Sequence, residues 1–72
     1  MNVAKIVKTA RETRGLSIGQ LADKSGISLS TLYYIESGRV SPRMDTMLQI
    51  MRVLDYDIIF NPRYKGGYSD ER

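Results

Sequence analysis

The stretch SIGQLADKSGISLSTLYYIESG, residues 17–38, decides how this chain folds. It opens with Ser17 three residues before Gln20, the spacing at which two side chains satisfy the free N–H groups of a helix start. A Gly-Ile-Ser turn at 26–28 then separates this short helix from a second one, for which the serine of the turn is the expected cap. Two helices joined by so short a turn can pack at a steep angle if small residues lie at their closest approach. Ala22 and Gly26 are the small residues expected there.

Two further helices flank this pair. On the amino-terminal side, apolar residues at helical spacing in 3–10 predict a helix over 2–14 that Gly15 ends. On the carboxyl-terminal side, Ser41-Pro42 is expected to start a helix that continues to Leu54. The sequence therefore predicts an all-α domain of four helices.

The apolar spacing changes after the fourth helix. Residues 55–61 alternate with the two-residue period of a half-buried strand, with Tyr56, Ile58 and Phe60 on the side that faces the helices. A single strand needs a neighbour for its backbone N–H and C=O groups, and the sequence has no second strand-like segment. We therefore expect it to pair antiparallel with the same strand of a second copy, with Ile59 also in the dimer seam.

The composition restricts the class of protein. The 72 residues are 26% charged and 42% hydrophobic, without Cys or His and without an apolar run long enough to span a membrane. Thiol and imidazole chemistry are thereby excluded, so we expect no enzyme activity, no cofactor and no metal site. The amino terminus resembles neither a signal nor a transit peptide, which predicts a cytoplasmic protein. We expect one domain over residues 1–61 and a flexible tail over 62–72.

Charge is distributed unevenly along the chain. Residues 1–43 contain seven basic and three acidic side chains, whereas residues 44–72 contain four and five. A basic half and a sequence pI near 9.5 favour a polyanion as partner, although a net charge of +3 is also common on ordinary protein surfaces. Four of the basic residues are interpreted as a solvated face whose long-range attraction is screened by salt: Lys5, Lys8, Arg14 and Lys24.

A series of residues carries a resemblance to a known family. It consists of Arg11, Gly15-Leu16-Ser17, Leu21-Ala22, Gly26-Ile27-Ser28, Thr31, Ile35-Glu36-Ser37-Gly38, Pro42, Leu48 and Leu54. With these residues the segment from Val7 to Leu54, two-thirds of the chain, resembles the Cro-type or xenobiotic-response-element helix-turn-helix family. The resemblance implies a lambda-repressor-like fold whose third helix enters the major groove of double-stranded DNA.

Three positions depart from the family pattern. Ile18 stands where a Gln usually contacts the DNA backbone, and Gly19 stands where an acid is usual. The peptide N–H groups of Ile18 and Gly19 could bind a phosphate in place of the missing side chain. Ser25 replaces a residue that is usually apolar, which affects the local packing.

The expected recognition helix offers an uncharged outer face. At 100° per residue Leu32, Ile35 and Thr31 face inward, and the outward residues include no Arg or Lys for a bidentate contact to guanine. Leu29 could instead meet a thymine methyl group, serine and tyrosine hydroxyls could bond base edges or phosphates, and two arginines beyond the helix could hold the backbone. The predicted DNA contacts are Ser17, Ile18, Gly19, Ser28, Leu29, Ser30, Tyr33, Tyr34, Ser37, Arg39 and Arg43.

Structural interpretations stand beside these functional ones. Tyr33 and Tyr34 could shield the core or fill a protein interface instead of contacting DNA. Arg11 and Glu36 match family positions that commonly pair between the first and third helices. Three methionines are expected in the core, with a partner-binding surface as the lesser alternative: Met44, Met47 and Met51.

The resemblance implies a sequence-specific transcription regulator, a repressor in the first instance, that binds a two-half-site operator as a homodimer. The strand LDYDIIF, residues 54–60, is similar to that of HipB-type antitoxins, which also bind a toxin protein. A small phage or host regulator without a toxin is the rival interpretation. A protein-interaction adaptor that retains the fold but lacks specific DNA binding is the alternative from another class. Ile18 and the uncharged third helix favour the adaptor. No membrane partner is expected.

Overall fold

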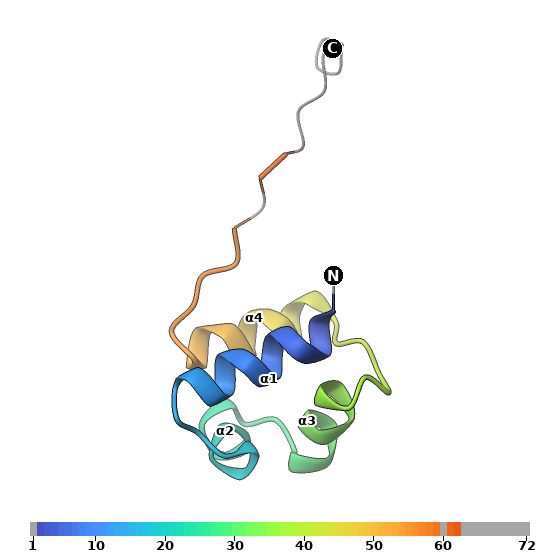
Figure 1. Cartoon of the computed structure of the whole chain (residues 1–72), viewed down its shortest axis with the longest axis vertical. Coiled ribbons are helices and arrows are strands. Elements are labelled where there is room, and N and C mark those ends of the chain that lie inside the picture. Colours follow the sequence, from blue (N-terminus) through green and yellow to red (C-terminus); the bar gives the residue numbers. More distant parts are fainter. Residues whose placement is uncertain (1, 60, 63–72) are drawn as a thin grey trace, which may run out of the picture.

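A computed structural model describes residues 2–59, 61 and 62 of the chain. Within them lie four helices: α1 (Val3–Thr13), α2 (Ile18–Ser25), α3 (Leu29–Glu36) and α4 (Met44–Val53). In Figure 1, α1 and α4 form the upper part of the helical body and α2 and α3 lie beneath them. α3 packs against both α1 and α2, and α2 also contacts α4. The predicted all-α domain of four helices is confirmed for this part of the chain.

None of the helices in the described residues combines the length and the apolarity that crossing a membrane requires.

Side-chain caps start α2 and α3 where the sequence predicted them. The Ser17 hydroxyl accepts from the Gln20 backbone N–H at 3.1 Å, and the Gln20 side chain accepts from the Ser17 backbone N–H at 2.7 Å. The Ser28 hydroxyl accepts from the Thr31 backbone N–H at 3.2 Å. Each of these N–H groups lies at the cap or in the first helical turn and has no acceptor within its own helix, so the caps fix both helix starts.

The predicted start of the fourth helix is wrong by two residues. Ser41 and Pro42 belong to the preceding loop, and α4 begins at Met44 with Arg43 as its N-cap residue. Arg43 makes no side-chain cap hydrogen bond, because its side chain carries only donors. The first turn holds Asp45 instead, whose negative charge complements the helix dipole. Ser-Pro therefore marks the boundary of this helix without supplying its cap.

The turn at the end of α4 uses a non-glycine residue in the left-handed region. Asp55 has φ +65°, its N–H donates to the carbonyl of Arg52 at 3.1 Å, and the Tyr56 N–H donates to the carbonyl of Met51 at 2.8 Å. These two bonds form a Schellman motif, in which Gly is the usual residue at the left-handed position. Asp adopts this conformation more readily than most side chains do.

Arg14 secures this turn from the end of α1. Its Nε donates to the carbonyl of Leu54 at 2.7 Å, its Nη2 donates to the carbonyl of Asp55 at 3.3 Å, and its guanidinium lies 4.4 Å from the centre of the Tyr56 ring. Arg14 is exposed, as expected for part of a solvated face, but it also makes these specific contacts, because the carbonyls at a helix end attract a cation. From this turn the chain rises away from the helices (Figure 1).

The core collects apolar side chains from all four helices. Thr31, predicted to face inward, is exposed and accepts a 2.8 Å hydrogen bond from the Ser28 hydroxyl. Met44 and Leu48 are also exposed, so the prediction of Met44 as a core residue is wrong; Met47 is half-buried and Met51 is buried. The buried apolar residues of the described part are Val7, Ala10, Leu21, Leu32, Ile35, Ile50, Met51 and Leu54.

The departure of Ser25 from the family pattern is accommodated by hydrogen bonds. Ser25 is buried, its hydroxyl accepts from the Ile27 N–H at 3.2 Å, and its carbonyl accepts from the Gln49 side-chain amide. Gly26 is needed for its φ of +74° and not for a close approach, since a Cβ there would lie 3.9 Å from the nearest atom, Gln49 Nε2. The expectation that Gly26 lets the two helices approach is therefore wrong.

The expected strand is not formed within the described residues. Residues 56–59 form no helix, turn or strand, with Ile58 packed against the core and Ile59 73% exposed. The inward and outward positions of these two side chains agree with the predicted alternation, whereas Tyr56 lies partly exposed against Arg14. Phe60 and residues 63–72 of the expected tail lie outside the described residues. Pairing with a second copy thus stays a prediction.

An ion pair between α1 and α3 confirms the predicted pairing of Arg11 with Glu36. Arg11 Nε and Nη2 donate to the two carboxylate oxygens at 2.8 and 2.9 Å, and Nη1 donates to the Leu16 carbonyl at 2.7 Å. The side chains of Arg11 and Glu36 are 11% and 7% exposed. The hydrogen bond to Glu36 raises the pKa of Arg11 above its usual value, although burial acts in the opposite direction. Arg11 therefore stays charged, and the pair fastens α1 to α3.

Replacing Arg11 with Met should lower the free energy of unfolding by about 3–5 kcal/mol, because Glu36 would remain nearly buried without a partner. The double variant Arg11→Met/Glu36→Leu should recover part of that loss, since it leaves no unpaired charge. Urea unfolding of the parent, the two single variants and the double variant, followed by circular dichroism, measures this. Strictly additive losses would contradict a coupled pair.

Candidate nucleic-acid interface

α2 and α3 both present unbonded N–H groups at their amino-terminal ends. The first two N–H groups of α2, on Ile18 and Gly19, and of α3, on Leu29 and Ser30, have no acceptor among the described residues. A Cβ at Gly19 would meet only the Ser17 hydroxyl, at 3.9 Å, so the surface is open there. Two helix starts with free donors and positive dipole ends are suited to bind phosphate oxygens.

A shallow depression of about 450 Å³ lies on the outer side of α3. It joins the start of α2 to α3 and to the loop that follows α3. Its lining residues are Ile18, Leu29, Ser30, Tyr33, Tyr34 and Arg39, and every one of them is a predicted DNA contact. The structure thus brings together six predicted residues from three separate parts of the chain.

Three large side chains of this depression are available to a partner. Leu29 is 52% exposed, Tyr33 55% and Tyr34 42%, so neither tyrosine shields the core. The two rings meet edge to face with 5.9 Å between their centres, and the Arg39 guanidinium lies 5.8 Å from the centre of the Tyr34 ring. These contacts orient the hydroxyls and the guanidinium without burying them.

Three of the predicted serines are committed to the fold. The Ser17 hydroxyl caps α2, and the Ser28 hydroxyl caps α3 while donating to Thr31 Oγ1 at 2.8 Å. The Ser37 hydroxyl donates to the Tyr34 carbonyl at 3.2 Å. Ser30 makes only a 3.5 Å contact with Ser28 and is the serine whose hydroxyl is most available. Serine readout of a ligand therefore falls mainly to Ser30.

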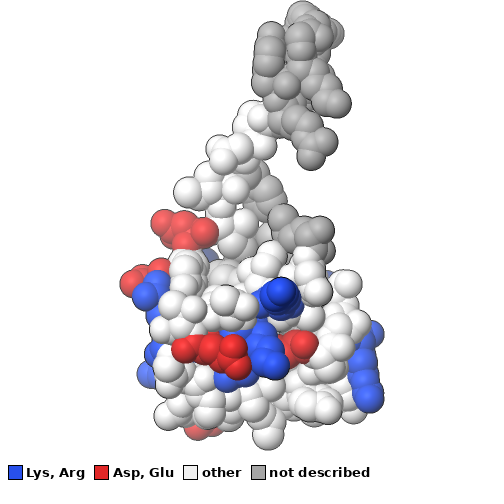
Figure 2. All heavy atoms as spheres, in the orientation of Figure 1, with Lys and Arg blue, Asp and Glu red and all other residues white. Residues whose placement is uncertain are grey.

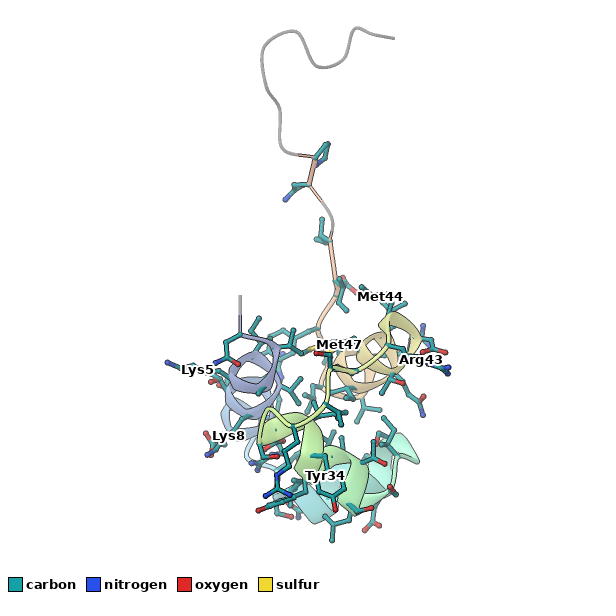
Figure 3. The ribbon with its side chains drawn as sticks, turned by 90° about the vertical axis from the view of Figure 1, so that its right-hand side faces the viewer. Lys5, Lys8, Tyr34, Arg43, Met44 and Met47 are labelled. Atoms are coloured by element: carbon teal, nitrogen blue, oxygen red, sulfur yellow. The ribbon has the colours of Figure 1, made fainter. Side chains whose placement is uncertain are left out.

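The two predicted arginines occupy different places. Arg39 lines the depression, whereas Arg43 lies at the start of α4, 3.4 Å from Asp45, in an exposed ion pair. Figure 3 shows Arg43 on the α4 side of the molecule and Tyr34 on its lower side. Arg43 could therefore reach only a part of an extended ligand that runs past the depression.

The electrostatics of the depression favour an anion. Glu36, the only acidic residue between Ser25 and Gly38, is held by Arg11 and directs no free carboxylate outward. Arg39 is the single charged residue among the lining side chains. On the face that α1 presents, by contrast, basic and acidic side chains are interleaved (Figure 2). The basic excess of residues 1–43 thus does not form a patch of one sign on that face.

In the part of the chain that the structure describes, no three acidic, His or Cys side chains lie close enough together to hold a metal ion.

A second surface lies on the other side of the molecule and is lined by Met44, Met47 and Met51, for which a partner-binding surface was the lesser alternative. An apolar groove of about 750 Å³ runs between α1, the start of α4 and residues 56–59. Met44 and Ile6 belong to it and are exposed. The spacing of the apolar residues of α4 carries a signal of exposed apolar surface. Met44 and Leu48 are four residues apart, so they lie on one side of α4 and widen its apolar stripe beyond the face that the core can bury.

Known proteins match most of this chain. A family model described as helix-turn-helix matches residues 7–60. An HTH-type transcriptional regulatory protein of Methanocaldococcus jannaschii is 34% identical over 55 residues, which are 76% of this chain and 17% of that protein. Repressor protein C of Escherichia phage P2 is 38% identical over 50 residues, 69% of this chain and 50% of the repressor. An HTH-type transcriptional regulator of Sinorhizobium fredii is 27% identical over 62 residues, 86% of this chain and 32% of that regulator. The chain therefore spans half or less of each of these relatives.

Replacing Ser28 with Ala should lower the free energy of unfolding by about 1 kcal/mol, because the cap of α3 is lost. Ser30→Ala, two residues further along and without a cap bond, is the matched control and should change it little. Thermal unfolding of both variants measures the difference. Equal effects would show that the Ser28 hydroxyl does not hold the helix start.

Proposed function

The chain belongs to the helix-turn-helix family, and from that premise we propose that it is a DNA-binding transcription regulator that acts as a repressor and places α3 in the major groove. The observation that carries this proposal is the depression on α3, where predicted contacts from α2, α3 and the following loop meet around one cation and no free acid. The names of the relatives, two regulators and a phage repressor, agree with it.

The DNA contact proposed for each residue follows from its exposure and from the hydrogen-bonding groups that the fold leaves free. Leu29 contacts a thymine methyl group, and Ser30, Tyr33 and Tyr34 bond base edges or neighbouring phosphates. Arg39 holds a phosphate at the rim of the depression. The free N–H groups at the starts of α2 and α3 hold further phosphates, so that Ile18 and Gly19 contribute through their backbone. Arg43 adds a phosphate contact outside the depression.

The proposed active form is a homodimer on two half-sites about one helical turn apart. Its seam is formed by residues 56–60, with Tyr56, Ile58, Ile59 and Phe60 as the dimerisation residues. The backbone N–H groups of residues 57–59 have no acceptor among the described residues, which supports pairing with another strand. Linking two subunits raises their joint affinity, because the second contact becomes intramolecular.

Two other roles have weaker support. An antitoxin role rests on the similarity of residues 54–60 to HipB-type antitoxins, and co-purification of the chain with the product of a neighbouring toxin gene tests it. An adaptor without specific DNA binding is favoured by the absence of Arg and Lys from α3. Binding of random duplex DNA at two salt concentrations separates adaptor from regulator, since neutralisation of phosphates gives a steep salt dependence.

Leu29→Ala and Tyr34→Ala should each weaken binding to the operator by roughly 1–3 kcal/mol and leave binding to random duplex nearly unchanged, because both side chains are assigned to base edges. An operator is first selected from a random library, and fluorescence anisotropy then measures both affinities. Lys24→Ala, outside the depression, is the control. Losses of the same size on both duplexes would refute base readout by these residues.

Arg39→Ala should weaken binding to all sequences alike and reduce the salt slope by about one phosphate per subunit, because Arg39 is assigned to the DNA backbone. Titrations at several salt concentrations give the slope, with Arg52→Ala on the exposed side of α4 as the control. A change in sequence preference with an unchanged slope would assign Arg39 to the bases instead.

A further inference from the structure

Apart from its wall of residues 56–59, the apolar groove on the side opposite the recognition helix has no role in the function proposed so far. Figure 3 places Lys5 and Met44 on its two sides and Met47 between them, on the opposite side of the molecule from Tyr34. We call it the α1–α4 groove; it is bounded by Ile6 on α1, by Met44 and Met47 on α4 and by residues 56–59. Met44 is 50% exposed and Ile59 73%, so its apolar rim faces solvent.

One wall of the α1–α4 groove is a backbone that needs a partner. Residues 57–59 form no helix or strand, and their N–H groups find no acceptor in the described part of the chain. A small apolar ligand would fill the groove but leave these groups unsatisfied. An extended peptide segment satisfies both requirements, because its backbone completes the ladder and its alternate side chains enter the groove. The occupant is therefore expected to be a strand.

The charges at the rim are complementary to each other. Lys5 stands on the α1 wall and Asp57 on the opposite wall, and neither forms an ion pair with a described residue. An acidic partner would pair only with Lys5, and a basic partner would pair only with Asp57. A second copy of the same segment brings its own Asp57 to Lys5 and its own Lys5 to Asp57, so that a twofold arrangement satisfies all four charges.

We propose that the α1–α4 groove receives residues 56–59 of a second copy of this chain, with Ile6 and Met44 as the receiving surface and Lys5 paired to the Asp57 of the other copy. This inference rests on the proposed homodimer and names the surface that completes it. The groove lies away from Tyr34, so docking there leaves the recognition helix free for DNA (Figure 3). A small core also gains from the apolar area that a second copy covers.

The first test replaces Met44 with Glu in the full chain. Met44 is the first residue of α4, where a negative charge suits the helix dipole, so the helical fold should be retained. Val40→Glu is the matched control, because Val40 is 47% exposed and lies outside the groove. Sedimentation equilibrium should show dimerisation at least tenfold weaker for Met44→Glu and unchanged for Val40→Glu, with the same helical circular dichroism for all three proteins.

The second test uses the two rim charges. Lys5→Glu and Asp57→Lys should each weaken self-association about fivefold, because each variant places like charges opposite one another in its own dimer. An equimolar mixture of the two should form heterodimers with both ion pairs restored, and native mass spectrometry should detect them well above the twofold excess over either homodimer that random pairing gives. Ion pairing of Lys5 with Asp57 inside one chain would give no such preference and would overturn the proposal.

The outcomes separate this inference from the function on which it rests. A parent chain that is monomeric at tens of micromolar would refute the homodimer and the groove assignment together. A dimeric parent with a Met44→Glu variant that dimerises equally well would refute only the groove assignment. Weakened dimers of Met44→Glu together with preferred heterodimers of the charge variants would support both.

Discussion

The bidentate ion pair of Arg11 and Glu36 is the interaction on which the rest of the structure depends. It joins α1 to α3, and through Nη1 the same guanidinium holds the Leu16 carbonyl in the turn that leads into α2. One side chain therefore sets the position of both helices of the helix-turn-helix unit. The pair also withdraws the only acidic group of α3 from the surface. The ion pair that joins α1 to α3 thus also keeps a negative charge off the outer face of α3.

The demands of the fold limit the chemistry left for DNA recognition. α2 and α3 are both eight residues long, and helices this short depend on their caps. Ser17 and Ser28 supply these caps, so their hydroxyls are not free for a ligand. In the proposed function, readout then falls to the exposed Leu29, Tyr33 and Tyr34, whose contacts are apolar or made through a phenol. Such a surface distinguishes bases by shape and methyl groups more than by bidentate hydrogen bonds.

Most of the fold could be predicted from the sequence because its signals are local. The capping box of Ser17 and the left-handed Gly26 lie within a few residues of the ends they fix. Arg14 could not be predicted, since its partners at Leu54 and Asp55 are forty residues away and lie close only in the folded chain. The exposure of Met44 likewise depends on which side of α4 its neighbours cover. Helical periodicity placed Leu29, Ser30, Tyr33 and Tyr34 on the outer face of α3, whereas the expectation that Ile18 and Arg39 join them came from the family resemblance.

Under the proposed function, the sparse charge of the depression on α3 ties DNA binding to self-association. A subunit with one cation in its depression and a few helix N–H groups neutralises few phosphates, and phosphate contacts supply most of the affinity of such proteins. Tight binding by so few contacts requires that two subunits act together, because the linked second subunit binds at a high effective concentration. The strength of the dimer then determines the protein concentration at which an operator is occupied. On this argument the α1–α4 groove, which touches no DNA, controls DNA binding as much as α3 does.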